Sequence, residues 1–126
     1  MDVDMTMGFN DYQKVAHETA QYPDMWMYNE NFNTDVKINY VYPALGLVGE
    51  AGEVAEKVKK IVRNKRGEWT KEMLSDIEKE LGDVLWYVAE LCSCLGLKMD
   101  DVAHANLNKL ADRAKRNVIK SEGDDR

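Results

Sequence analysis

Apolar residues recur every three or four positions in four stretches of the chain, which is the spacing of an amphipathic α-helix. The four predicted helices begin near Phe9, Pro43, Thr70 and Asp100. Thr70 and Asp100 are suited to cap helix N-termini, and Gly96 is suited to follow a helix C-terminus. The buried stripes predicted for the last three helices are Leu45, Val48, Ala51, Ala55, Val58 and Val62; Leu74, Ile77, Leu81, Val84, Leu85, Val88, Leu91 and Leu95; and Val102, Ala105, Leu110 and Ala114.

No stretch alternates apolar and polar residues in the manner of a half-buried strand. Residues 24–40 have no helical period and are rich in Asn and Asp, so they are predicted to form a long loop. This loop carries Trp26 and Phe32, and a long loop in a small domain is more often functional than idle. The pattern predicts an all-α fold, a bundle of four to five helices whose wide apolar faces favour oligomerisation.

The length of 126 residues fits one domain. We expect a flexible N-terminus over 1–8, a single helical domain over 9–117 and a charged tail over 118–126. The net charge of −6 argues against nucleic-acid binding, which usually needs a basic surface. A nucleotide substrate stays possible, because a bound metal ion reverses the local sign of an acidic pocket.

The chain shows no signal-peptide pattern and no apolar run of about 18 residues, which predicts a cytoplasmic protein without membrane contact. Cys92 and Cys94 stand two positions apart in a predicted helix and therefore point in different directions. We expect both to be reduced thiols, without a disulfide bond or a zinc site.

Two carboxylate pairs, Glu50 with Glu53 and Glu80 with Asp83, each have i, i+3 spacing in a predicted helix. Residues three apart share a helix face, so four carboxylates would converge between two packed helices and repel one another. A hard divalent cation, with Mg²⁺ as the first candidate, would relieve this repulsion. The alternative is a solvated face with ion pairs, but these acids lie at the edges of the apolar stripes.

Glycines accompany the carboxylates at i, i+3 and i+6 of the second helix, as Gly46, Gly49 and Gly52. Each glycine weakens a helix by about 1 kcal/mol relative to alanine. Three together indicate the close approach of another helix or of a ligand.

The segments "GLVGEAGEVAEKVKK" and "EKELGDVLWYVAEL" resemble the MazG-type family of all-α nucleoside triphosphate pyrophosphohydrolases, whose signature is E-x-x-E followed by E-x-x-D. The resemblance extends from about residue 9 to about residue 117. It implies that Glu50, Glu53, Glu80 and Asp83 bind two or more Mg²⁺ ions, with Mn²⁺ as a substitute. Either Glu50 or Glu53 would be the catalytic base that takes a proton from the attacking water.

The resemblance also implies contacts with the substrate. His17 and Trp26 match residues that line the base pocket of related dCTP pyrophosphatases, and Tyr87 matches a tyrosine that contacts sugar or phosphate. Some relatives carry an Asn where this chain has Tyr42, so the identity of the substrate's base is left open. The phosphates would be held by Lys57, Lys60, Asn106, Lys109 and Arg113.

Each of these residues has a structural alternative. His17 would lie on a helix surface, and Trp26 would plug the end of the bundle. The lysines of the second helix would pair with neighbouring glutamates. Lys109 and Arg113 lie near a helix C-terminus, where cations are favoured in any case.

The resemblance implies hydrolysis of a (d)NTP to (d)NMP and pyrophosphate by a homodimer or homotetramer that shapes or cleans the nucleotide pool. The open aromatic loop and the departure at Tyr42 favour a broad or a purine-preferring deoxynucleotide activity, with dGTP as the purine substrate. Two alternatives stay open. One is a pyrophosphatase of the same superfamily specific for dCTP or dUTP, and the other is a non-catalytic helical regulatory module.

Overall fold

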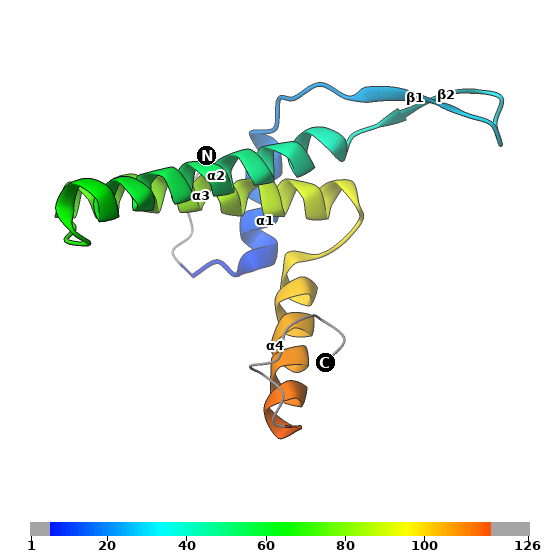
Figure 1. The fold of residues 1–126 in the computed structure, drawn as a ribbon. Coiled ribbons are helices and arrows are strands. Elements are labelled where there is room, and N and C mark those ends of the chain that lie inside the picture. The colour runs from blue at the N-terminus through cyan, green and yellow to red at the C-terminus, as the bar shows by residue number, and fades with distance from the viewer. Residues whose placement is uncertain (1–5, 117–126) are drawn as a thin grey trace.

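The computed structural model describes residues 6–116, which form four helices and one two-stranded antiparallel sheet (Figure 1). The all-α fold class is thereby confirmed, with a small sheet added to it. The predicted flexible N-terminus and charged tail fall mainly on residues 1–5 and 117–126, outside the described residues. The elements are α1 (Phe9–Glu18), β1 (Met25–Asn29), β2 (Thr34–Ile38), α2 (Val41–Lys65), α3 (Lys71–Cys94) and α4 (Met99–Lys115).

The long helices α2 and α3 lie antiparallel and make the most extensive contact between elements (Figure 1). Their connection is tight because Arg66 and Gly67 both adopt positive φ angles, of 53° and 85°. The predicted N-cap of α3 is confirmed, since the Thr70 hydroxyl accepts a hydrogen bond from the Met73 amide at 3.2 Å. The sequence between the two carboxylate pairs therefore folds back on itself and brings the pairs to the same region.

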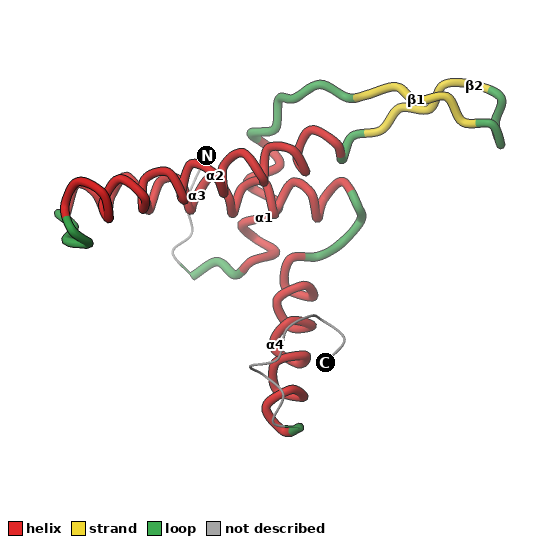
Figure 2. The backbone as a smooth tube through the Cα atoms, viewed as in Figure 1, coloured by secondary structure: helices red, strands yellow, loops and turns green. Residues whose placement is uncertain are grey.

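The core forms where α1 crosses α3 and reaches the start of α4. In this arrangement α1 runs across the α2–α3 pair, and α4 leads away from the pair (Figure 2). The buried core residues Ala16, Ala89, Cys92 and Met99 are small or flexible, which permits the close crossing. Both cysteines are free thiols, as predicted.

Side chains of α1 fix the start of α4. The Met99 amide donates to Gln13 Oε1 at 2.8 Å, and the Asp100 amide donates to Asn10 Oδ1 at 3.0 Å. These bonds satisfy amides at a helix start that have no partner within the helix. The predicted N-cap at Asp100 is wrong, because α4 begins at Met99 and its N-cap is Lys98.

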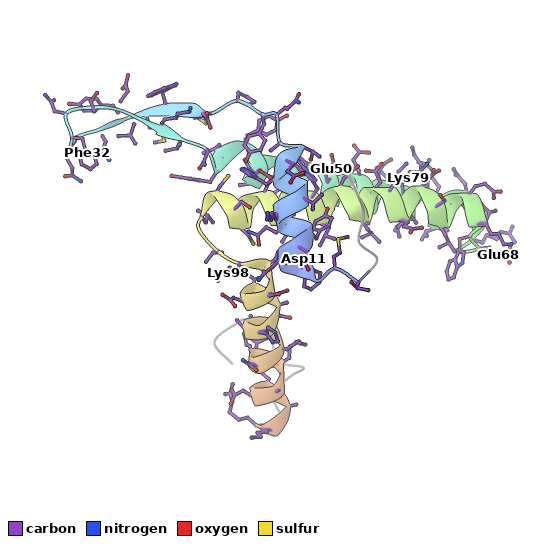
Figure 3. All side chains as sticks on the ribbon, turned by 180° about the vertical axis from the view of Figure 1, so that it is seen from behind. Asp11, Phe32, Glu50, Glu68, Lys79 and Lys98 are labelled. Carbon is purple, nitrogen blue, oxygen red and sulfur yellow. The ribbon has the colours of Figure 1, made fainter. Side chains whose placement is uncertain are left out.

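Residues 24–40 form a β-hairpin, so the predicted structureless loop is wrong. β1 and β2 pair antiparallel, with Trp26 opposite Lys37 and Met27 opposite Val36. The hairpin projects beyond the helices, with Phe32 at its tip (Figure 3). Nearly every side chain of β1 is exposed, so the residues on either face of the hairpin can be polar or apolar. The alternation that marks a half-buried strand is consequently missing from the sequence.

The apolar stripe predicted to be buried on α2 is exposed throughout, and Val48, for example, is 71% exposed. The face of α2 that packs on α3 instead carries Pro43, Leu47, Glu50, Val54, Lys57 and Ile61. This face has the spacing of a helix stripe but contains two charged residues, so hydrophobicity alone favoured the other face. The predicted buried residues on the other helices that are also exposed are Leu74, Leu81, Leu95, Val102, Ala105 and Ala114.

No helix among residues 6–116 is long and apolar enough to cross a membrane.

Candidate active site

Three carboxylates meet between α2 and α3. Oxygen atoms of Glu50, Glu80 and Asp83 all lie within 4.8 Å of one another. Glu80 and Asp83 stand one turn apart on α3, and Glu50 faces them from the packed side of α2, near the level where α1 crosses the pair (Figure 3). Carboxylate oxygens are the ligands that Mg²⁺ and Mn²⁺ prefer, so this donor set fits a hard divalent cation.

The charges of the cluster are not balanced by the protein alone. Burial raises the pKa of Glu50, as do a hydrogen bond with Glu80 and the negative charges of Asp83, Glu80 and Glu53. Two carboxyl groups can share a hydrogen bond only when one of them holds a proton. Lys57 Nζ lies 3.7 Å from Glu80 Oε1 and offsets only part of the negative charge. The cluster therefore favours a proton or a cation.

The raised pKa of Glu50 predicts how stability depends on pH. The folded protein binds this proton more tightly than the unfolded chain, whose glutamate pKa is 4.5. That stabilisation is complete below pH 4.5 and is lost as the pH rises through the raised pKa. In EDTA, Glu50→Gln should therefore gain stability relative to the unsubstituted protein as the pH rises, measured by urea unfolding.

Glu56→Gln is the control, because its carboxylate pairs with Lys59 at 2.9 Å and this contact lowers its pKa. Its relative stability should change slightly in the opposite sense with pH. Equal pH profiles for the two variants would contradict the repulsion at Glu50.

Glu53 lies one turn beyond Glu50 and is exposed, and its carboxylate is not part of the three-residue cluster. Its charge nevertheless acts on Glu50. The predicted role of Glu53 as a metal ligand or catalytic base stays a prediction.

Tyr87 borders the cluster and lies against the backbone of α2 at Gly46. A Cβ atom at Gly46 would overlap the Tyr87 ring, whereas one at Gly49 or Gly52 would meet nothing within 4 Å. Burial raises the pKa of Tyr87, as do the proximity of Tyr42, Glu50 and Asp83 and a hydrogen bond with Tyr42. The close approach predicted from the glycines is confirmed at Gly46 alone.

We expect Gly46→Ala to destabilise the protein by about 1–3 kcal/mol, because the ring must move or the helices must separate. Gly52→Ala on the same helix should stabilise it by about 0.5–1 kcal/mol, because open space surrounds the added methyl group. Urea unfolding of both variants measures the difference. Equal stabilisation of the two would contradict the packing of Tyr87 on Gly46.

Comparison with known proteins identifies the family. The model for the MazG nucleotide pyrophosphohydrolase domain matches residues 43–118, which is more than half of the chain. This chain belongs to the MazG nucleotide pyrophosphohydrolase family. It is 46% identical over 115 residues to the Gene 37 protein of Mycobacterium phage L5, covering 91% of this chain and 96% of the phage protein. No solved structure matches the chain significantly. The resemblance stated from the two carboxylate motifs is confirmed.

In this MazG domain a basic hollow of about 320 Å³ adjoins the acidic cluster through Lys57, which reaches Glu80. The hollow also contains Lys60, so both predicted phosphate-binding lysines lie on one side of the cluster. The lining residues are Lys57, Lys60, Ile61, Asn64, Met73, Asp76 and Ile77.

The other predicted substrate residues lie apart from the cluster. Trp26 is in β1 of the projecting hairpin (Figure 1), and Asn106 and Lys109 are exposed on α4, which leads away from the α2–α3 pair. Arg113 is buried near the end of α4. His17 is on α1, where its Nδ1 lies 3.1 Å from Glu90 Oε1. Within this one chain these residues lie on three different elements, α1, β1 and α4, and their substrate contacts stay predictions.

Sequence reasoning missed Glu90, which is completely buried. Its carboxylate contacts His17 and accepts a hydrogen bond from the Tyr22 hydroxyl at 2.8 Å. The sequence did hold a signal, because Glu80, Asp83, Tyr87 and Glu90 continue one helix stripe at intervals of three, four and three residues. A glutamate on such a stripe beside the core needs partners.

Proposed function

We propose that this MazG-family protein is a Mg²⁺-dependent hydrolase that converts (d)NTP to (d)NMP and pyrophosphate. The observation that carries the proposal is the cluster of Glu50, Glu80 and Asp83, which adjoins the basic hollow at Lys57 and Lys60. One side of the α2–α3 pair thus offers ligands for a cation and counter-charges for phosphates. The family match supports nucleotide pyrophosphohydrolase activity.

The three clustered carboxylates and Glu53 would hold two or more Mg²⁺ ions, with Mn²⁺ as a substitute. When bound, the metal supplies a water of lowered pKa and positive charge beside the phosphates. Lys57 and Lys60 bind the β- and γ-phosphate oxygens and stabilise the pyrophosphate that leaves. Water attacks the α-phosphorus and pyrophosphate leaves, while one carboxylate of the first pair, Glu50 or Glu53, accepts the proton of that water.

The substrate we propose is a deoxynucleotide with a purine base, dGTP in particular, and its hydrolysis shapes or cleans the nucleotide pool. The location that we propose is the cytoplasm. The test is a panel of the common (d)NTPs with Mg²⁺, with Mn²⁺ and with EDTA, with (d)NMP quantified by chromatography. A faster reaction with dCTP or dUTP would overturn the purine preference. Absence of both turnover and metal-dependent heat in calorimetry would favour a non-catalytic module.

The protein is proposed to act as a homodimer or homotetramer. The support is the exposed apolar stripe on α2, which includes Leu45, Val48, Val58 and Val62. A contiguous apolar face of this length is typical of an association surface. Covering it with the same face of a second copy would complete a bundle of α2 and α3 helices.

Val48→Asp should weaken self-association by about 100-fold, because a two-fold interface would bury two uncompensated charges. Light scattering at micromolar concentration should then show a smaller species than that of the unsubstituted protein. Glu78→Gln, an exposed change on α3, is the control. A monomer before substitution would contradict the proposed assembly.

A further inference from the structure

Two tyrosine rings form a flat stack beside the acidic cluster. The rings of Tyr22 and Tyr42 are parallel within 2°, with centroids 5.5 Å apart. This is an offset stack in the favourable range for aromatic pairs. Tyr42 is 44% exposed although Tyr22 covers one of its faces. The stack therefore leaves a large part of Tyr42 in contact with solvent.

Contacts on several sides hold the ring of Tyr22 in place. The Tyr22 hydroxyl donates to the buried Glu90 at 2.8 Å and lies 3.1 Å from Cys94 Sγ. The edge of Trp86 meets Tyr22 at an interplanar angle of 85°, with ring centroids 6.3 Å apart. The Trp86 indole is itself held, because its Nε1 donates to Thr19 Oγ1 at 2.8 Å. Tyr22 is thus a rigid support for the exposed Tyr42.

The stack is continuous with the candidate active site. Tyr42 forms a hydrogen bond with Tyr87, which is close to Glu50 and Asp83. Tyr42 precedes Glu50 by eight residues on α2, which is about 12 Å along a helix axis. The acidic cluster would take the phosphates, so a base bound at Tyr42 would lie at the opposite end of the nucleoside triphosphate.

We propose that the Tyr22–Tyr42 stack is the platform on which the nucleobase of the substrate lies. The inference rests on the proposed nucleotide pyrophosphohydrolase function and adds the residues that contact the base. Stacking on an aromatic face accepts every base, and a larger ring system covers more of the platform. The platform therefore predicts a broad (d)NTP specificity in which purines bind more tightly than pyrimidines.

The test measures binding of dGMP and dCMP to the full chain without turnover, by the shift of tyrosine ring signals in NMR. Tyr42→Leu keeps apolar bulk but removes the ring, and it should weaken dGMP binding about tenfold. Tyr42→Phe keeps the ring and should bind within about twofold of the unsubstituted protein. Tyr40→Leu, at a neighbouring and similarly exposed tyrosine (41%), is the control and should change nothing.

Equal dGMP affinity in Tyr42→Leu and the unsubstituted protein would overturn the platform, as would tighter binding of dCMP than of dGMP or no nucleotide binding at all. A failure of the proposed function would be recognised by a different observation, because the unsubstituted protein would then release no pyrophosphate from any (d)NTP. Tripolyphosphate should inhibit Tyr42→Leu and the unsubstituted protein equally, because it lacks a base. Selective loss of this inhibition in the variant would also contradict the assignment.

Discussion

Asp83→Asn should lower kcat for pyrophosphate release by at least about 100-fold. Changing a residue that only supports a metal ligand costs 10- to 100-fold in affinity or activity, so changing a ligand itself should cost more. Asp83 is one of three clustered carboxylates, and its exposed position predicts little loss of folding stability. The measurement is steady-state kinetics at saturating Mg²⁺, together with the metal-binding heat.

The control for Asp83→Asn is Glu78→Gln, on the same helix and also exposed, which should keep full turnover. Glu53→Gln separates the two roles left to that residue. Loss of kcat with unchanged metal affinity supports the base, whereas loss of both supports a ligand. Full turnover in both Asp83→Asn and Glu53→Gln would show that the site is assigned to the wrong residues.

Glu90→Ala should destabilise the fold by about 3–5 kcal/mol, the largest stability effect that we expect. Removing one partner of a buried charged network leaves the others unsatisfied. Here the loss affects the Tyr22 hydroxyl and the His17 imidazole, and it opens a cavity beside the core residue Ala89. Urea unfolding measures the change.

His17→Ala removes the exposed partner of Glu90 and should cost about 1 kcal/mol, because Tyr22 still bonds the carboxylate. Glu90→Gln keeps the shape and one acceptor, so its cost should lie between those of the two alanine variants. A loss below 1 kcal/mol in Glu90→Ala would show that the network contributes little to stability.

The sequence was sufficient to predict the four helices and three of the four carboxylates expected to meet between two of them. Thr70 caps the start of α3 with its hydroxyl, and Gly96 follows the end of α3 with a positive φ angle. Both effects depend on the residue itself, so they can be predicted without knowing the tertiary contacts. Glu80 and Asp83 share a helix face by spacing alone. Glu50 joins them because the α2–α3 turn brings its helix back antiparallel.

The buried faces were harder to predict. α2 carries an apolar stripe that faces solvent and a mixed stripe, with Glu50 and Lys57, that faces α3. Hydrophobicity identifies the first stripe as the core face, although the second makes the contact within this chain. A pattern read from one sequence does not distinguish packing within a chain from packing between copies.

The hairpin and the tyrosine stack depend on contacts that leave no periodic signal. β1 and β2 expose both faces, so pairing follows from backbone hydrogen bonds rather than from alternation. Tyr22 and Tyr42 are 20 residues apart and meet only because the hairpin returns the chain to α1.

The central claim is attack of water at the α-phosphorus of a nucleoside triphosphate. Hydrolysis of dGTP by the unsubstituted protein with Mg²⁺ in ¹⁸O-labelled water, followed by ³¹P NMR, tests it directly. We predict equal amounts of dGMP and pyrophosphate, with the label in dGMP. Release of orthophosphate, or label in pyrophosphate, would contradict the account.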